Sequence, residues 1–539
     1  MGQENNNDSV EKRKIVHMEN RNLKRRDVLK GIATLPVIGS FVYAFLKKTS
    51  LDRQKKKNIL AELGVSEESS SVLPKTTMKK AGELIRLGII GFGVRGEQLA
   101  RAAGFAHPDW VEGKRRDAQN NKMDRTLEDW FHQEDLNVKI SGICEVFDMR
   151  AERGIATSKN DFRPGGGSGS LPGAKRYRHY RDMLESSDID AVMITTPDFH
   201  HARITIEAVE SGKHVYCEKC MTRTDEEAYK VVDAVKKGDV VFQLGHQNPQ
   251  TAAYLKAKEI IDKNILGKIT LVETTTNRNT SWGAWIRHLD ANGKPMPGSP
   301  ETIDWDLWHE SRPKVPFSID RYYNWTKWWN YATGLSGQLL GHEYDAVNQL
   351  MNIGVPKSVV ASGGIYFFKD NREIPDLFHV VFEYPDKDLT VIYSASLANS
   401  RSRGRVFMGH DASMEVGSTL KVMVDRNSTR FKRKLQSGII DPALPLFSYR
   451  PGSKDIDAVT SATEQYYANR GLIYTYLGGK RIDVTHLHVK EWLDCIRNGG
   501  KPSCHIDKAF EVTMACHMAT KSYREKRRVE WDPGKRRIV

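Results

Sequence analysis

Hydrophobic and polar positions alternate in a strand–helix order through the first half of the chain. Apolar runs of about four to eight residues between turn residues are typical of buried parallel strands, and stretches with helical spacing separate them. This order predicts a doubly wound parallel sheet covered by helices. The expected strands are IRLGII (85–90), VKISGICEV (138–146), DAVMITTP (190–197), KHVYC (213–217) and VVFQLG (240–245). The expected helices lie near 180–186, 201–211, 224–237 and 251–264, with a flexible Gly-rich loop at 163–173.

From about residue 268 the pattern changes to strands that follow one another without helices. Such an order predicts an antiparallel sheet. Two C-terminal stretches, 485–503 and 507–527, have helical spacing and are expected to pack back onto the body of the protein. Residues 282–329 are rich in Trp and Tyr. The expected strands of this half are KITLVETTT (268–276), FHVVFEYP (378–385), LTVIYSASLA (389–398) and RVFMGH (405–410).

The chain of 539 residues is too long for one simple domain. Its hydrophobic content of 39% is that of a globular protein. We therefore expect an α/β domain followed by an α+β domain. The expected parts are a signal or anchor segment at 1–48, a linker at 49–83, a nucleotide-binding domain at 84–247, and a substrate-binding antiparallel-sheet domain with C-terminal helices at 248–539.

The positive charge gathers at the N-terminus. Of the net charge of +14, the first 57 residues supply a large share, with 14 Lys and Arg against 6 Asp and Glu. No array of basic and aromatic residues accompanies it, so nucleic acid is not an expected partner.

The same N-terminal region predicts export. The basic stretch KRRDVLK, with Arg25 and Arg26, precedes the uncharged run Gly31–Leu46, in the order of a signal segment. It resembles a twin-arginine signal, with Lys24 where Ser or Thr is usual and Val28 where Phe is usual. No clear cleavage site follows, so we expect a periplasmic protein or one anchored in the membrane and facing the periplasm. An ordinary buried helix after a basic tail is the alternative.

Six cysteines are too few for a disulfide scaffold in a chain of this length. Cys217 and Cys220 have the C-x-x-C spacing of a redox dithiol or half a zinc site. No second C-x-x-C exists to complete a zinc ribbon, so no metal site is expected.

The strand at 85–90 runs into a G-x-G-x-x-G turn and a helix. In such a turn the first glycine (Gly91) allows a tight bend, and the second (Gly93) lets the backbone approach a pyrophosphate. The third (Gly96) lets helix and strand pack closely, and the helix N-terminus attracts the anion. This strand–turn–helix unit predicts a dinucleotide site.

Glu145 ends the next strand and is the candidate acid for the ribose hydroxyls. It follows Gly96 by 49 residues, whereas the minimal motif has about 20. The polar, charged stretch 107–137 accounts for the excess as a surface insertion. A carboxylate at this place repels a 2′-phosphate, so NAD is favoured over NADP. A solvated glutamate at a strand end is the alternative.

Several motifs, in order, resemble those of the Gfo/Idh/MocA oxidoreductase family over roughly Ile85–Pro533. Glycines recur by chance, so one motif is weak evidence, but an ordered series is specific. The matching stretches are GIIGFGVRG (88–96), ICEV (143–146), TTPDFHH (195–201), GKHVYCEKC (212–220), GHQNPQTAAYLKAKEIID (245–262), IDWDLWHESRPKVPF (303–317) and GHEYD (341–345).

The resemblance implies a Rossmann domain that binds NAD(P) and a large sheet domain, with a sugar or polyol substrate between them. Lys219 would hold the substrate hydroxyl beside the nicotinamide, His342 would take its proton, and Asp345 completes the H-x-x-D motif. Association through the large sheet into a homo-oligomer is also implied. The implied cofactor-binding residues are Gly91, Phe92, Gly93, Val94, Arg95, Gly96, Glu145, Thr196, Pro197, His201, Glu218 and Lys219.

Two positions depart from the family pattern. Cys220 stands where the E-K-P signature has proline, which fixes φ and rigidifies the turn. Gln338 stands where dehydrogenase members have aspartate, four residues before the histidine. Glutamine can orient an imidazole but cannot stabilise an imidazolium as a carboxylate would, so the proton transfer of a plain dehydrogenase is in question.

The leading hypothesis is an NAD-dependent oxidoreductase that acts on a hydroxyl of a sugar or glycoside. The alternatives are a redox-neutral glycosidase or eliminase with retained NAD, a non-catalytic sugar-binding relative, and a thiol or metal protein built on Cys217 and Cys220. Aromatic side chains supply stacking surfaces for sugar rings, or serve as core. The candidates are Trp282, Trp285, Trp305, Trp308, Tyr322, Tyr323, Trp325, Trp328 and Trp329.

Overall fold

The computed structural model describes most of the chain after residue 82. The described ranges are parts of 44–65, then 82–159, 171–281, 297–310, 312–401, 403–450, the backbone of 474–477, and 480–539. The helical turns before residue 62 belong to a unit apart from residues 63–539. No helix in the described ranges is long and apolar enough to cross a membrane. The twin-arginine stretch, most of the loop 163–173, Trp282 and Trp285 lie outside these ranges.

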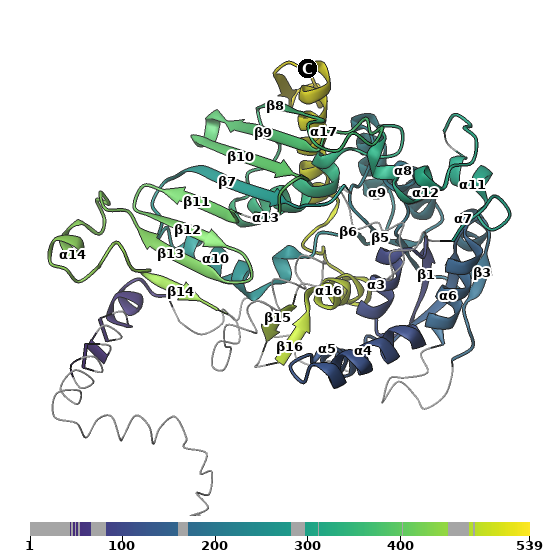
Figure 1. The fold of residues 1–539 in the computed structure, drawn as a ribbon, viewed down its shortest axis with the longest axis horizontal. Helices are drawn as coiled ribbons and strands as arrows, with labels where there is room; N and C mark the ends of the chain where they lie inside the picture. The colour runs from purple at the N-terminus through teal and green to yellow at the C-terminus, as the bar shows by residue number, and fades with distance from the viewer. Residues whose placement is uncertain are drawn as a thin grey trace, which may run out of the picture. The chain divides into compact units, whose positions relative to one another are not determined.

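A parallel sheet forms the nucleotide-binding half, as predicted (Figure 1). Within the described residues it has six strands in the order β3-β2-β1-β4-β5-β6. The strands that follow β1 in the chain are first added on one side of it (β2, β3) and then on the other (β4, β5, β6), so the order switches beside β1. In open α/β sheets ligands bind at that switch point, outside the carboxyl ends of the strands. The strands are β1 (Ile85–Ile90), β2 (Val138–Cys144), β3 (Lys175–Tyr177), β4 (Ala191–Ile194), β5 (His214–Cys217) and β6 (Phe242–Leu244). Strand β3 was not predicted, because three residues with one buried side chain form no apolar run.

Helices cover this sheet close to the expected positions. The predicted helix at 224–237 corresponds to α9, which begins with a reciprocal capping box between Thr224 and Glu227. The insertion 107–137 folds into two helices around a small core of Ala106, Val111 and Trp130. The helices are α3 (Val94–Ala102), α4 (Pro108–Asn120), α5 (Thr126–Phe131), α6 (Asp148–Ser158), α7 (Tyr180–Leu184), α8 (Asp198–Glu210) and α9 (Asp225–Lys237).

The second sheet is the large antiparallel sheet that was predicted, with one parallel pair of strands in it. Its ten strands in the described ranges run in the order β14-β13-β12-β11-β7-β10-β9-β8-β17-β18. Strands β7 and β10 pair in parallel, because a long helical connection separates β7 from the β8-β9-β10 meander and returns the chain in the same direction. The strands are β7 (Ile269–Asn277), β8 (Ser358–Gly364), β9 (Leu377–Tyr384), β10 (Leu389–Ser396), β11 (Arg405–Gly409), β12 (Ala412–Val416), β13 (Leu420–Val424), β14 (Phe447–Tyr449), β17 (Val529–Asp532) and β18 (Arg537–Ile538).

The remaining elements lie in connections within and between the two sheets. A small antiparallel pair, β15 (Tyr474–Leu477) and β16 (Lys480–Asp483), precedes the C-terminal helices. The turn η3 (Ser336–Leu340) is π-helical and continues into α13. The helices and turns are η1 (Asn248–Gln250), α10 (Ala252–Asp262), α11 (Trp305–His309), α12 (Ile319–Tyr323), η2 (Trp325–Lys327), η3, α13 (Gly341–Met351), η4 (Pro385–Lys387), α14 (Lys432–Gln436), α16 (Val484–Asn498) and α17 (Ile506–Glu525).

The two C-terminal helices pack back onto the body of the protein, and α17 contacts both halves. Helix α16 packs against α3, and its Val489, Trp492 and Leu493 are buried in the same core as the first parallel strands. Helix α17 packs against both α9 and β8 (Figure 1). The end of the chain therefore contributes to the core of the nucleotide-binding half.

An aromatic segment after residue 297 packs on the nucleotide-binding half. The amide of Asp148 donates to the Thr302 carbonyl at 3.0 Å, and the amide of Asp304 donates to the Val146 carbonyl at 2.9 Å. Phe147 therefore shares a core with residues of this segment. Its other members are Phe199, Ile303, Trp308, Tyr322, Tyr323, Trp328 and Tyr331.

The replacement Trp492→Ala is expected to destabilise the fold by about 3–5 kcal/mol, because it removes a fully buried indole from the shared core. Urea denaturation of the full chain measures this free energy of unfolding. Tyr366→Ala is the control, since that ring is 66% exposed and should cost less than about 1 kcal/mol. Equal stability of the two variants would contradict the place of α16 in the core.

Candidate functional site

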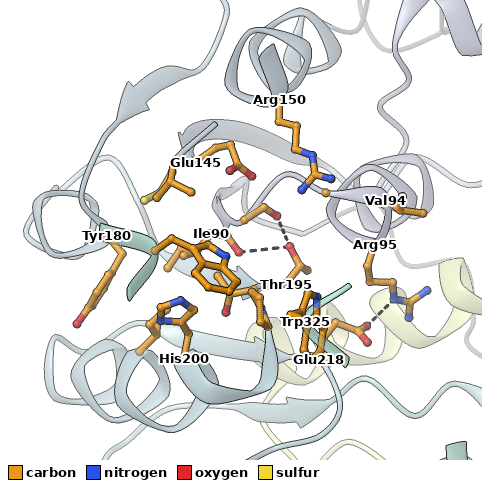
Figure 2. A pocket seen from close by; sticks show the side chains of 18 of the residues that line it. Ile90, Val94, Arg95, Glu145, Arg150, Tyr180, Thr195, His200, Glu218 and Trp325 are labelled. Carbon is orange, nitrogen blue, oxygen red and sulfur yellow. Dashed lines mark hydrogen bonds and ion pairs between the residues drawn. The ribbon is translucent and has the colours of Figure 1, made fainter. Parts of the chain in front are cut away.

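A pocket opens at the carboxyl ends of β1, β2, β4 and β5 (Figure 2). Backbone and side chains from both halves of the chain line it. Of the predicted site residues, those that line it are Gly91, Gly93, Val94, Arg95, Glu145, Thr196, Pro197, Glu218, Lys219 and His342.

The Gly-rich turn has the geometry of an anion cradle. Gly91 has φ of +86°, a conformation that favours glycine. A Cβ on Gly96 would lie 2.5 Å from the Gly91 carbonyl oxygen, so only glycine lets α3 approach the turn. Gly93 caps α3 without a side-chain hydrogen bond. The first backbone amides of the helix are therefore left for an anion in the pocket.

Glu145 is buried at the end of β2, where two backbone amides hold its carboxylate. The amide of Phe92 donates to Oε2 at 2.6 Å, and the amide of Phe147 donates to Oε1 at 3.0 Å. Arg150 points toward the same part of the pocket and donates to the Tyr322 hydroxyl at 3.1 Å (Figure 2). The carboxylate is thus fixed in orientation beside the Gly-rich turn, rather than being a solvated side chain.

An ion pair closes the opposite side of the turn. Arg95 Nε donates to Glu218 Oε1 at 2.6 Å, and the Glu218 side chain is only 7% exposed (Figure 2). A Cβ on Gly245 would lie 2.5 Å from the Glu218 carboxylate, so this glycine makes room for the pair. The pair joins α3 to the end of β5.

Lys219 belongs to a buried hydrogen-bond chain that ends at a carboxylate. Its Nζ donates to the Gln338 backbone carbonyl at 3.1 Å and to Gln338 Oε1 at 3.3 Å. Gln338 Nε2 donates to both oxygens of Asp198 at 2.8 Å. Thr333 donates to the same carboxylate through its amide at 3.1 Å and its hydroxyl at 2.9 Å. Burial lowers the pKa of Lys219, and the Asp198 charge partly opposes this shift.

Sequence reasoning did not single out Asp198. The residue was present in the TTPDFHH motif, but nothing in its spacing connects it with Gln338, which is 140 positions later. The family pattern has a carboxylate at position 338. In this chain Asp198 supplies a carboxylate instead, and Gln338 is hydrogen-bonded to it.

His342 lines the pocket near a second histidine. Its ring lies 5.1 Å from the ring of His246, centre to centre, and its Nδ1 has no hydrogen-bond partner among the described residues. Burial and the neighbouring His246 and Lys219 hold the pKa of His342 well below its usual value. The imidazole is therefore neutral at physiological pH.

Four predicted residues lie outside the pocket lining. Phe92 contributes its backbone amide to Glu145, and Gly96 packs under the turn. Asp345 is 1% exposed and lies behind His342, near His246.

The fourth, His201, holds two backbone carbonyls. Its Nδ1 lies 2.6 Å from the Cys220 oxygen, and its Nε2 lies 2.7 Å from the Thr196 oxygen. Burial opposes its charge, but Cys217, Asp198 and the Cys220 carbonyl outweigh burial and raise the pKa to about 9. A protonated ring donates from both nitrogens, which matches two acceptors.

The two cysteines that flank Glu218 and Lys219 are buried thiols outside the pocket. Cys217 is fully buried, and Cys220 is 4% exposed. Burial raises the pKa of Cys220 to about 12, so its thiol stays protonated. The Lys219–Cys220 peptide bond is cis. All six cysteines are described, and all are free.

The far end of the pocket carries polar residues that the sequence did not reveal. Arg203 Nη1 forms an ion pair with Glu310 Oε2 at 2.8 Å, and His179 Nε2 lies 3.4 Å from Glu310 Oε1. His200 and Tyr180 also point toward the pocket (Figure 2). These residues come from three separate segments, so no spacing signal could have grouped them.

Three of the predicted aromatic residues line the pocket: Trp308, Tyr322 and Trp325. Trp305 stacks on Trp308 with ring centres 4.7 Å apart, and Tyr323 is buried. Trp328 is buried in the same core, and Trp329 packs near Tyr523. The aromatic segment is therefore partly core and partly a wall of the pocket.

Family models match both halves of the chain. The model described as "Oxidoreductase family, NAD-binding Rossmann fold" of Gfo/Idh/MocA matches residues 85–246. The model described as "Oxidoreductase family, C-terminal alpha/beta domain" matches residues 298–531. The prediction of a dinucleotide-binding Rossmann domain is thereby confirmed.

Curated relatives match parts of the chain. Levoglucosan dehydrogenase of Pseudarthrobacter phenanthrenivorans is 29% identical over 185 residues, 34% of this chain and 41% of the relative. Inositol 2-dehydrogenase of Klebsiella pneumoniae is 36% identical over 117 residues, 21% of this chain and 34% of the relative. The matches span less than half the length of these relatives.

Solved structures share the fold over most of the chain. A levoglucosan dehydrogenase complex with NADH and levoglucosan has a TM-score of 0.54 at 17% identity, covering 83% of this chain and 99% of its own. The WlbA dehydrogenase of Bordetella pertussis, with NADH and UDP-GlcNAcA, has a TM-score of 0.52 at 15% identity, covering 84% and 98%.

The free energy of unfolding is expected to fall at alkaline pH, because the buried His201 loses its proton there. Its folded pKa of about 9 exceeds the unfolded value of about 6.5, so its contribution is full below pH 6.5 and lost as the pH rises through 9. This contribution is roughly 3 kcal/mol. The unfolding free energy of His201→Gln should therefore fall less steeply than that of the wild type between these values. Parallel pH profiles in urea denaturation would disprove a charged His201.

Proposed function

Because the chain belongs to the Gfo/Idh/MocA oxidoreductase family, we propose that it is an NAD-dependent oxidoreductase acting on a hydroxyl of a sugar or glycoside. The observation that carries this proposal is that Lys219 and His342 line the same pocket as the Gly-rich turn and Glu145. The relatives named for levoglucosan and inositol support a polyhydroxylated substrate.

The residues present fit a dinucleotide. The turn from Gly91 to Gly96 leaves room for the pyrophosphate of a dinucleotide and exposes the N-terminus of α3 to it. The Glu145 carboxylate, fixed by two amides, accepts hydrogen bonds from ribose hydroxyls and repels a 2′-phosphate, which favours NAD over NADP. When bound, NAD supplies a nicotinamide that takes hydride from the carbon that bears the reacting hydroxyl.

Lys219 positions the substrate hydroxyl. Two of the three N–H directions of its ammonium are taken by the Gln338 oxygens, which fixes Nζ at the pocket wall. The third has no acceptor among the described residues and is available to a substrate oxygen. Asp198, behind Gln338, keeps a negative charge near the ammonium and so opposes the loss of its proton.

His342 takes the hydroxyl proton. Its lowered pKa keeps the ring neutral, so a nitrogen lone pair is available at physiological pH. Gln338 contacts Lys219 and Asp198 rather than replacing an acid beside the imidazole. Although Gln338 stands where family members have aspartate, the site still contains a carboxylate, that of Asp198, which is linked to Lys219 through the Gln338 side chain.

The test is a panel of sugars, polyols and glycosides with NAD, followed by NADH formation. Lys219→Met is expected to lower kcat/KM by about 100-fold or more while NAD binding persists, because the reacting hydroxyl loses its partner. Lys213→Met is the matched control, since the Lys213 ammonium also donates two hydrogen bonds to carbonyl oxygens but lies outside the pocket. An unchanged kcat/KM in Lys219→Met would refute the assignment. Sugar binding without turnover by the wild type would instead identify a binding protein.

The aromatic wall favours a second candidate, a redox-neutral glycosidase or eliminase with retained NAD. Trp308, Tyr322 and Trp325 line the same pocket as Gly91 and Glu145, on a segment bonded to the Rossmann half through backbone amides. A nucleotide against the Gly-rich turn is thereby enclosed from the other side. Enclosure slows dissociation, which suits a cofactor that is reduced and reoxidised in each cycle.

Incubation of the dialysed protein with a nitrophenyl glycoside, without added NAD, separates the two candidates. The redox-neutral reaction predicts bound NAD after dialysis and release of many equivalents of aglycone per chain. The Lys219→Met variant should retain NAD but release little aglycone. Dependence of turnover on stoichiometric added NAD would favour the plain dehydrogenase.

We also propose that the N-terminal segment exports the protein and anchors it to the membrane, facing the periplasm. This proposal is supported by the sequence, in which the basic pair Arg25 and Arg26 precedes the uncharged run Gly31–Leu46. The arginine pair and most of that run lie outside the described residues. Association of copies through the large sheet remains a prediction from the family resemblance.

A further inference from the structure

A cluster of metal-ligating side chains lies behind the pocket. His246 follows β6, Asp345 lies on α13, and Cys504 precedes α17, so three distant segments meet there. Their exposed fractions are 2%, 1% and 1%, respectively. The reaction proposed above uses none of the three.

The spacing of the cluster is that of ligands around one small cation. Cys504 Sγ lies 3.6 Å from Asp345 Oδ1, and His246 Nδ1 lies 3.6 Å from the same oxygen. One ligand atom from each residue lies within 4.8 Å of the others. In a tetrahedral zinc site with bonds of about 2.0–2.3 Å, neighbouring ligand atoms are roughly 3.3–3.8 Å apart. Both of these separations fall in that range.

Three polar atoms of the cluster lack a hydrogen-bond partner among the described residues. Neither ring nitrogen of His246 has a hydrogen-bond partner among the described residues, and neither does Asp345 Oδ2. Each buried unsatisfied polar atom costs about 1–3 kcal/mol, and a buried carboxylate costs more. A cation between these atoms removes that cost.

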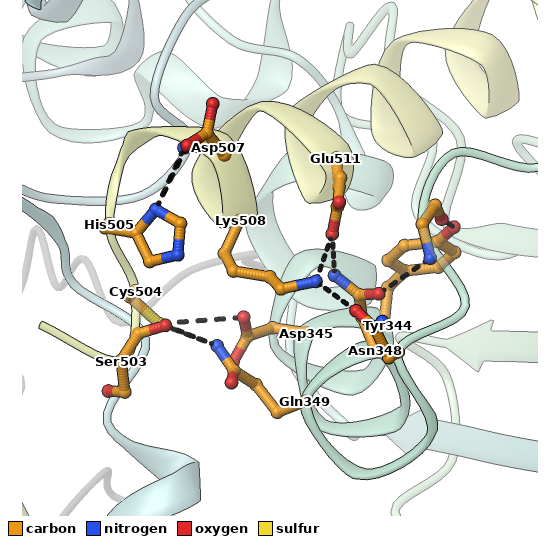
Figure 3. A network of polar contacts seen from close by, with 12 residues as sticks. Tyr344, Asp345, Asn348, Gln349, Ser503, Cys504, His505, Asp507, Lys508 and Glu511 are labelled. Carbon is orange, nitrogen blue, oxygen red and sulfur yellow. Dashed lines mark hydrogen bonds and ion pairs between the residues drawn. The ribbon is translucent and has the colours of Figure 1, made fainter. Parts of the chain in front are cut away.

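Among the residues that the structure describes, no lysine or arginine forms an ion pair with Asp345. The ammonium of Lys508, on α17, is bonded to Asn352 at 2.6 Å and Glu511 at 2.8 Å (Figure 3). Gln349 Nε2 approaches Cys504 Sγ at 3.6 Å as a donor, so the sulfur accepts a hydrogen bond, as a metal-bound thiolate does (Figure 3).

We propose that His246, Asp345 and Cys504 bind a divalent cation of the zinc type. An imidazole, a carboxylate and a thiolate form the mixed donor set that zinc and cobalt accept, whereas magnesium and calcium require oxygen ligands. Asp345 lies on the same helix as His342, three residues later. The cation would therefore fix α13 against the loops after β6 and before α17, and hold His342 in position. This inference does not depend on the identity of the substrate.

The full chain, exposed to Zn²⁺ and dialysed, is expected to hold one zinc per molecule by elemental mass spectrometry. Replacement by Co²⁺ should produce tetrahedral d–d bands and a thiolate-to-cobalt charge-transfer band. Cys504→Ser is expected to abolish the charge-transfer band, and His246→Gln to weaken metal binding by about 100-fold or more, because one of three protein ligands is lost.

Cys516→Ala is the matched control, since Cys516 is an equally buried thiol that is not in the cluster. It should retain the metal and the cobalt spectrum. Circular dichroism establishes that each variant is folded; if Cys504→Ser does not fold, the cobalt spectrum of the wild type decides. Substoichiometric zinc in the wild type, or a cobalt spectrum without a thiolate band, would overturn the proposal, whether or not the oxidoreductase is active.

Discussion

The arrangement of the pocket depends on the hydrogen bonds that hold the Lys219 ammonium at the pocket wall. Lys219 follows β5, Gln338 lies in the π-helical turn before α13, and Asp198 opens α8. Removing these groups from water would be costly without the hydrogen bonds that join them. The chain from Lys219 through Gln338 to Asp198 therefore fixes three elements relative to one another. It also lowers the pKa of the lysine by burial while keeping an opposing charge within reach.

Both departures from the family pattern are accommodated locally. Gln338 presents its carbonyl oxygen to Lys219 and its amide to Asp198, which is the orientation that satisfies both neighbours. Cys220 is a buried thiol whose carbonyl, with that of Thr196, is held by His201. The C-x-x-C spacing thus results from a strand residue followed by a turn residue. The chemistry of this stretch lies in Glu218 and Lys219, which the cysteines flank.

Much of the fold could be predicted because the parallel strands and their helices are strongly periodic, as α9 shows with its capping box. The strand β3 and the parallel pairing of β7 with β10 could not be predicted. The first has too few apolar residues to form a pattern, and the second depends on the path of a long connection. In the site, motifs identified Gly91, Glu145, Lys219 and His342 as members of one pocket. Asp198 and the residues at the far end of the pocket contact partners from distant parts of the chain.

The sequence by itself determined three local features of the site. They are a Gly-rich turn after an apolar strand, an acid after the next strand, and a lysine after a later strand. These features are local, because turn conformation and strand burial depend on neighbouring residues. Only the tertiary structure decided which polar groups satisfy one another in the interior. It placed Asp198 behind Lys219, returned α16 to the nucleotide-binding core, and brought His246, Asp345 and Cys504 together. Such contacts depend on how the elements pack in space, which no spacing along the chain records.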